Sequence, residues 1–199
     1  MWPTIVFSTF LLYNLSANDT LHVDLDNSQI NWIGRKVTGE HTGTLKFSNG
    51  WVLMDKKTLV GGKLIFDMTS ISNTDIESVE WKQNLEDHLK AEDFFYVDSF
   101  PRAILEIKGN KLLPHSEKST SNNQIRAELT IRGISHEINL PYILLQGENH
   151  FIAEGTVNVD RTLYNIQYKS GKFIENLGDK LIYDDFSVQF IVHTKDNEE

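Results

Sequence analysis

The chain has 199 residues, of which 40% are hydrophobic and 24% charged, so we expect one globular domain with a sizeable core rather than a disordered chain. Its net charge of −9 argues against nucleic acid and anionic membrane surfaces as partners. The absence of cysteine excludes disulfides, thiolate catalysis and cysteine-ligated metals.

The first 17 residues predict a secretory signal peptide. Residues 2–15 form an uncharged run of about the length of a hydrophobic signal core, and the small residues Ser16 and Ala17 follow it. The run is shorter than the roughly 20 residues of a transmembrane helix, and no basic residue precedes it. The alternatives are a buried N-terminal strand or a misassigned start. Export predicts a periplasmic or secreted protein without stable membrane insertion.

Beyond this run, apolar and polar residues mostly alternate with a period of two, which is typical of strands with one buried face. Residues 22–36 predict two extended pieces separated by a turn at 26–28. Asn49 and Gly50 are the strongest hairpin signal in the chain. Further strands are expected at 44–47, 51–54, 58–68, 102–108, 124–132, 136–145, 151–161 and 184–193.

Residues 84–101 interrupt this alternation. Leu85 and Leu89 stand four apart, so a single helical turn would place both on one face with His88 beside them, and two phenylalanines follow. A second irregular stretch covers residues 162–180. We expect one or two short helices here, which lid one end of the strand assembly.

About eight to ten strands with hairpin-length connections favour antiparallel pairing. We therefore predict an all-β fold, a single antiparallel barrel of about eight strands. Such a barrel is either filled by its own side chains or holds one small ligand. The small residues Ala103, Ala127, Ala153 and Gly155 on the inward faces favour free space inside.

The predicted interior would suit a long apolar chain. Each buried methylene contributes about 0.8 kcal/mol, whereas association costs an estimated 4 to 15 kcal/mol. A ligand held by its tail alone therefore needs more than about ten carbons inside. The residues expected to line this interior are Trp32, Leu45, Phe47, Leu64, Phe66, Met68, Leu89, Phe94, Phe95, Leu105, Ala127, Leu129, Ile131, Val157, Phe173, Phe186, Val188 and Phe190.

Six segments, taken together, resemble the YceI family of lipocalin-like, polyisoprenoid-binding proteins, which are mostly exported bacterial proteins. The resemblance implies a lipocalin-like barrel over residues 21–194, with a solvated tail at 195–199. It also implies an isoprenoid or similar long-chain amphiphile as the ligand, a role in its transport or storage, an association with stress responses, and no catalytic set. The segments are WIGRKVTGEHTG (32–43), GGKLIFDMTSI (61–71), LEDHLKAEDFFYVDSFP (85–101), AELTIRGISHEINLP (127–141), VDRTLYNIQYKSGKF (159–173) and DDFSVQF (184–190).

The chain departs from the commoner family pattern in the loop at 51–57 and in lacking basic residues at its N-terminus. The first departure bears on the structure of the barrel rim, and the second bears on whether the chain is exported. A filled barrel with a structural or stress-interaction role is the alternative function, and an enzyme in the same shell is a third. A homodimer is the general expectation for an oligomer.

His41 and His88 are the two histidines inside the segments that match the lid and the glycine-flanked bend. One interpretation is structural, with each ring satisfying nearby polar groups. The other places one of them against the polar head of the ligand. No histidine stands in HxH, HxxxH or HExxH spacing, so no metal site and no cofactor other than the bound lipid is expected.

Overall fold

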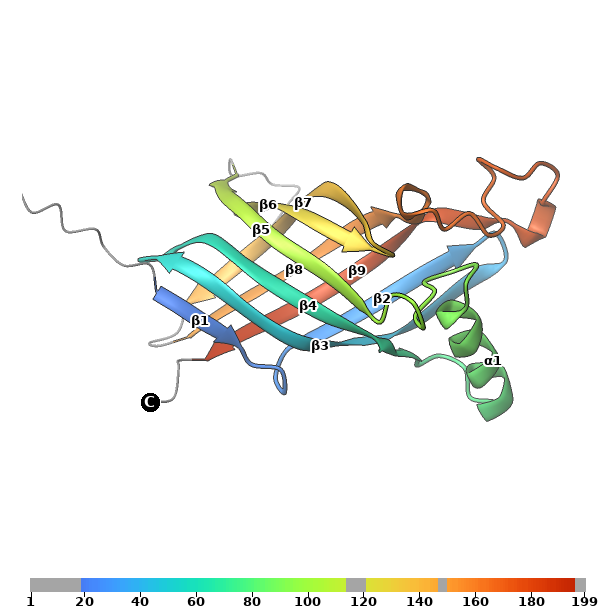
Figure 1. Ribbon diagram of the computed structural model, residues 1–199, viewed down its shortest axis with the longest axis horizontal. Helices are drawn as coiled ribbons and strands as arrows, with labels where there is room; N and C mark the ends of the chain where they lie inside the picture. The colour runs from blue at the N-terminus through green and yellow to red at the C-terminus, as the bar shows by residue number, and fades with distance from the viewer. Residues whose placement is uncertain (1–18, 114–120, 147–149, 196–199) are drawn as a thin grey trace, which may run out of the picture.

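The computed structural model describes residues 19–113, 121–146 and 150–195. The predicted signal peptide at 1–17 and most of the predicted tail lie outside these residues. The described chain forms antiparallel strands wrapped around one axis, with one α-helix and two short 3-10 helices (Figure 1). The strands are β1 (Asp19–Val23), β2 (Gln29–Lys36), β3 (Gly39–Asp55), β4 (Thr58–Asn73), β5 (Arg102–Leu112), β6 (Asn123–Ile131), β7 (Ile134–Gln146), β8 (Phe151–Asp160) and β9 (Ile182–Lys195). The helices are α1 (Val79–Lys90), η1 (Arg161–Tyr164) and η2 (Gly178–Lys180).

Strands β2 to β9 close into an eight-stranded barrel. Each strand pairs with the next along the chain, and β9 pairs with β2, with Ile191 opposite Gln29. All pairings are antiparallel. The predicted all-β antiparallel barrel is therefore confirmed.

Strands β1 and β2 share one position in the barrel wall. Both pair with β3 and β9, β1 at one end of the barrel and β2 along the rest. The turn between them is held by Asp24, whose carboxylate accepts hydrogen bonds from the Asp26 amide at 3.1 Å and the Asn27 side chain at 2.7 Å. The predicted turn between two extended pieces is thus confirmed.

The predicted hairpin at Asn49 and Gly50 is wrong. Strand β3 runs straight through both residues, and its register with β4 shifts between Phe47 and Asn49. A β-carbon at Gly50 would lie 2.7 Å from Cγ2 of Val23, so glycine is needed here for close packing against β1. The same dipeptide therefore marks a bulge, and the chain reverses instead at 55–58.

The helix is longer and begins earlier than expected. Ser78 caps α1 by accepting a hydrogen bond from the Trp81 amide at 3.4 Å, and residues 70–73 belong to β4 rather than to a loop. No residue of α1 is fully buried. Its first two turns are mostly polar, so they give no apolar period from which a helix could be predicted.

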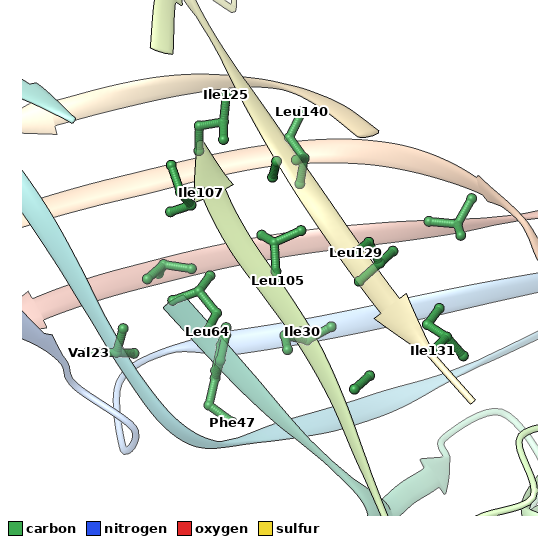
Figure 2. Close-up of a cluster of buried hydrophobic side chains, with 14 of the residues drawn as sticks. Val23, Ile30, Phe47, Leu64, Leu105, Ile107, Ile125, Leu129, Ile131 and Leu140 are labelled. Carbon is green, nitrogen blue, oxygen red and sulfur yellow. The ribbon is translucent and has the colours of Figure 1, made fainter. Parts of the chain in front are cut away.

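Inward-facing side chains of the strands form the core. Figure 2 shows Phe47, Leu64, Leu105 and Leu129 reaching into the barrel interior from β3, β4, β5 and β6. Two segments cover one end of the barrel, which we name the capped end: the lid (residues 79–100) and the plug (residues 161–181) (Figure 1). The opposite end, where β1 pairs with the last residues of β9, is named the closed end.

Candidate functional site

A cavity of ≈ 210 Å³ runs along the barrel interior. All but two of the residues predicted to line the interior lie on its wall; whether they contact a ligand stays a prediction. Those on the wall are Trp32, Leu45, Phe47, Leu64, Phe66, Met68, Leu89, Phe94, Phe95, Leu105, Leu129, Ile131, Val157, Phe186, Val188 and Phe190.

Ala127 and Phe173 are not on the cavity wall. Ala127 has no exposed surface and is packed between Ile107 and Ile138 on the neighbouring strands. Phe173 lies in a turn of the plug, where its amide donates to the Ser170 carbonyl at 3.2 Å, and half of its surface is exposed. The alternation of apolar and polar residues has no meaning outside a strand, so the direction of this ring could not be predicted.

Sequence reasoning missed many wall residues. Most are apolar and in phase with predicted ones, as Ile107 is with Leu105, so stricter use of the alternation finds them. Four polar or ionisable side chains had no such signal: Arg35, Arg161, Tyr183 and Asp185. The missed apolar residues are Ile30, Val52, Leu59, Ile71, Ile107, Ile125, Ile138, Leu140, Val159, Ile166, Ile182 and Val192.

The free space comes from alanines rather than from glycine. Ala103 and Ala153 both line the cavity. A β-carbon at Gly155, in contrast, would lie 2.7 Å from Cζ of Phe190 and 2.4 Å from the Pro141 carbonyl oxygen. The position of Gly155 is therefore filled by the Phe190 ring, contrary to the expectation that this residue leaves room.

The cavity ends blindly at the closed end. Its wall there is made of Val52, Leu59 and Val192, which expose 6%, 4% and 6% of their surface. Leu21 and Val23 of β1 are buried in the same core. This end is sealed by packed side chains of the strands.

At the capped end the cavity reaches the surface between β2 and β9, at an opening that we name the mouth. Gly34 lies opposite Phe186 and Lys36 opposite Ile182, so residues 183–185 face the single residue Arg35. Tyr183 and Asp185 are exposed wall residues, and a β-carbon at Gly34 would meet nothing within 4 Å. At this irregularity three residues of β9 lie opposite one residue of β2, and wall residues reach the surface.

Arg35 is the basic side chain at the mouth. Its Nε donates to Glu40 at 3.0 Å, and Nη1 donates to the Ser187 hydroxyl at 2.9 Å. Its side chain keeps 39% of its surface exposed. Arg35 is therefore a charged group beside the mouth, while the cavity wall is hydrocarbon.

The cavity is long. From Val192 to Ile182, β9 spans about 33 Å at roughly 3.3 Å per residue, which a strand tilt of about 40° reduces to about 25 Å along the barrel axis. The volume of ≈ 210 Å³ is therefore spread along an elongated space. Such a shape admits one hydrocarbon chain and opposes fused rings.

The lid contributes Leu89, Phe94 and Phe95 to the wall. It is fastened to β4 by Glu86, which accepts hydrogen bonds from the Ser72 hydroxyl at 2.9 Å and the Asn73 amide at 2.7 Å. Burial raises the pKa of Glu86, but these hydrogen bonds outweigh it and leave the pKa below its usual range.

The plug fills a gap in the barrel wall. Strands β7 and β8 pair only from Tyr142 opposite Gly155 outward to the closed end, so residues 134–140 have no partner in β8. The plug occupies this place, with Tyr164 and Ile166 almost completely buried. Its backbone is tied to β7 where the His136 ring lies 2.9 Å from the Leu163 carbonyl oxygen.

Arg161 holds the plug in shape. Only 4% of its surface is exposed, and it donates to the carbonyls of Ile166 at 2.8 Å and of Ile182 and Tyr183 at 3.1 Å. Asp184 lies 3.6 Å from its guanidinium. Burial lowers the pKa of Arg161, and the nearby carboxylates oppose that shift.

His88 links the lid to the plug and lies outside the cavity. Its ring stands edge-on to Phe94 and to Tyr168 of the plug, with centroids 4.9 and 4.6 Å away, and Nε2 lies 2.9 Å from Asp93. Arg132 makes a second link by donating to the carbonyls of Phe94 and Asn165, both at 2.9 Å.

His41 also lies outside the cavity. Its Nδ1 is 2.9 Å from the Asp75 carboxylate, which also accepts the Thr42 amide at 2.7 Å and so ties the segment before α1 to β3. The geometry therefore favours the structural interpretation of both histidines over the alternative of a contact with the polar head of the ligand. Their rings meet polar partners that are supplied by the protein itself.

Within the described residues, no group of three or more histidine, aspartate or glutamate side chains is placed to hold a metal ion. The one described α-helix, of 12 residues, is too short and too polar to cross a membrane.

The protein-family model of the YceI-like domain matches residues 21–194. The chain belongs to the YceI-like family. No curated protein sequence matches it. The match covers the barrel, the lid and the plug, so these parts together are the family's domain.

Solved structures share the fold. BcnA from Burkholderia cenocepacia is 17% identical, with a TM-score of 0.65 over 86% of this chain and 98% of that one. A polyisoprenoid-binding domain from Saccharophagus degradans, implicated in plant cell wall breakdown, is 12% identical, with a TM-score of 0.65 over 89% and 98%. The YceI protein of Campylobacter jejuni is 16% identical, with a TM-score of 0.53 over 83% and 85%. At these identities the likeness shows the fold alone.

Proposed function

We propose that the protein binds one long-chain isoprenoid or similar amphiphilic lipid inside its barrel and acts as a carrier or store for it. The observation that carries this proposal is the elongated, hydrocarbon-lined cavity with one blind end and one mouth. The polyisoprenoid-binding domain of Saccharophagus degradans has the same fold and supports the same ligand class.

The cavity favours this function over a filled barrel. A dry apolar cavity of about 150 Å³ binds benzene, and the present one is larger. Unfilled apolar space gives up dispersion contacts, and a chain along about 25 Å of wall would restore them. A ligand therefore stabilises a structure that an empty interior leaves underpacked.

The polar head of the ligand is proposed to lie at the mouth, beside Arg35 and Asp185. Both line the cavity where it meets solvent, whereas His41 and His88 do not line it. Arg35→Met should change the ratio of affinities for a polyprenyl phosphate and the matching polyprenol. His41→Ala should leave this ratio unchanged. An unchanged ratio in Arg35→Met would place the head elsewhere.

Native mass spectrometry after reconstitution with chains of graded length tests the ligand class. We expect one bound molecule per chain, with retention rising steeply beyond about ten carbons, and much weaker retention of a sterol. Failure to retain any polyprenyl or acyl chain of that length would remove the proposal. Retention of the sterol and the chain alike would overturn the inferred shape of the site.

A variant at the blind end tests the depth of binding. Ala153 faces the cavity near Val192, so Ala153→Leu shortens the free space. Affinity for the longest chains should fall while shorter chains still bind. Thr156→Leu places the same side chain on the outer face of the same strand and is the control. An equal loss in both variants would argue against burial of the tail at this end.

We also propose that the protein performs no chemistry on its ligand. Arg161, the buried cation on the wall, already donates to three backbone carbonyls. The other ionisable wall groups lie at the mouth, away from the tail. Ligand recovered unchanged after prolonged incubation would support this, and a processed product would contradict it.

A location in the periplasm or outside the cell is a further part of the proposal. It rests on residues 1–17, whose uncharged run and small residues favour cleavage after export. Cell fractionation with N-terminal sequencing checks it. Recovery of the full-length chain in the cytosol would contradict it.

A further inference from the structure

Exposed apolar side chains are concentrated at the capped end. Among the described residues, ten large apolar side chains are exposed, and only Leu25, Leu112 and Leu145 lie away from this end. Exposed apolar groups gathered in one region mark an interaction surface. The other seven are Val37, Val79, Trp81, Leu163, Phe173, Ile174 and Tyr183.

Four of these side chains are carried by the turn after β2, the plug and the start of β9, and we name them the apolar rim: Val37, Phe173, Ile174 and Tyr183. Each exposes between 45% and 50% of its surface. The turn that carries Val37 is held to the plug by its amide, which donates to the Leu181 carbonyl at 3.2 Å. Tyr183 follows directly in β9 and lines the cavity itself. The rim is thus continuous with the cavity wall.

The charges of the plug are balanced around this rim. Lys172 is paired with Asp160 at 2.7 Å and lies 3.7 Å from Asp184. Of the remaining exposed or half-exposed charges in the plug, Lys169 and Lys180 offset Glu175 and Asp179. The whole chain carries a net charge of −9, so an anionic surface would repel it.

A long lipid tail needs a path into the cavity that avoids water. A chain of more than about ten carbons that crosses water loses the burial of every methylene on the way. If the mouth lies against a bilayer, the tail passes from one apolar medium to another. Half-exposed aromatic and aliphatic side chains at the mouth suit the boundary between lipid and water.

From these observations we propose that the apolar rim docks the mouth onto the surface of a zwitterionic phospholipid bilayer, without a membrane-spanning segment. This docking rests on the proposed lipid-carrying function and adds the surface from which the ligand is taken or to which it is delivered.

Co-sedimentation of the purified protein with dioleoylphosphatidylcholine vesicles tests the docking. The parent should bind, and Phe173→Ser with Ile174→Ser should weaken binding at least about tenfold. Leu112→Ser with Leu145→Ser removes two leucines at the closed end that are at least about as exposed as the rim residues, and should change binding less than about twofold. Replacing about a third of the lipid by phosphatidylglycerol should not strengthen binding.

Several results would overturn the proposal. These are equal binding by the two double variants, no binding of the parent to phosphatidylcholine, and binding that depends on phosphatidylglycerol. A dimer that the rim variant converts to a monomer in sedimentation velocity would assign the rim to a second copy of the chain. Loading from detergent micelles, followed by native mass spectrometry, distinguishes a failure of membrane docking from a failure of lipid binding. The rim variant should still load, whereas failure of the parent to load would sink the lipid-carrying function itself.

Discussion

The two ends of the barrel are closed by different means. At the closed end, side chains carried on strands meet, including Leu21, Val23 and Met54, which expose 7% or less of their surface. At the capped end, two segments that join no strand ladder cover the opening, and polar side chains fasten them. Under the proposed function, the closed end would limit how deep a ligand sits, and the capped end would control its passage.

The largest expected effect is at Arg161. Arg161→Met removes three hydrogen bonds to plug and β9 carbonyls and leaves the nearby Asp184 without its cation. The free energy of unfolding should fall by about 3 to 5 kcal/mol, because buried polar groups lose their partners. Urea denaturation measures it.

The exposed Arg126 provides the control for that measurement. It lies 3.6 Å from Glu137, with 59% of its side chain exposed. Arg126→Met should change the free energy of unfolding by no more than about 0.5 kcal/mol. Similar losses in both variants would show that the plug does not depend on a buried polar network.

The lid should control ligand release. Leu89→Ala removes a lid side chain that lines the cavity, and we expect release to become roughly tenfold faster through lost apolar contact. Leu85→Ala, one helical turn earlier and also half-buried, does not touch the cavity and is the matched control. Stopped-flow transfer of a fluorescent polyprenyl chain to acceptor vesicles measures both. Equal release rates would remove the lid from the pathway.

The attachment of α1 should depend on pH through Glu86. Its folded-state pKa is lowered, so its contribution is full above the unfolded pKa of about 4.3 and is lost as pH falls through the folded pKa. Glu86→Gln should cost about 1 kcal/mol of unfolding free energy at pH 7 and little near pH 3. Urea denaturation at both values checks this. The exposed Glu92→Gln should show no such difference between the two pH values. If the unfolding free energies of Glu86→Gln and the parent differed equally at both pH values, the role of the Glu86 carboxylate in attaching α1 would be contradicted.

The smallest effect is expected at the closed end. Tyr142 is fully buried, its hydroxyl donates to Asn110 at 3.2 Å, and burial raises its pKa to about 12. Tyr142→Phe keeps the ring and removes one hydrogen bond, so stability should fall by about 1 kcal/mol with ligand release unchanged. Thermal unfolding and the transfer assay check both. Faster release would mean that the ligand also leaves through this end.

The alternation of apolar residues predicted the barrel well because each inward-facing residue has a fixed direction in a strand. Leu105 and Leu129 were placed on the cavity wall in this way. The same logic failed where backbone geometry departs from a regular strand. At Asn49 and Gly50 a turn-forming pair serves instead as a bulge that packs against β1.

The capped end was harder to predict because its elements lack a period. The first two turns of α1 carry few apolar residues, and Phe173 of the plug points outward. Arg35 and Asp185 reach the mouth only because the β2–β9 register shifts there, and that shift depends on pairing between distant strands. Such tertiary pairing leaves no mark in the local sequence.

Strand pairing also places both ends of the described chain far from the mouth. Asp19 lies opposite Met54, and His22 lies opposite Lys195, at the closed end (Figure 1). A fluorescent label, an affinity handle or an anchoring group fused to Lys195 would therefore lie at the closed end, opposite the mouth. A protein immobilised through this end would leave its mouth accessible to vesicles in solution.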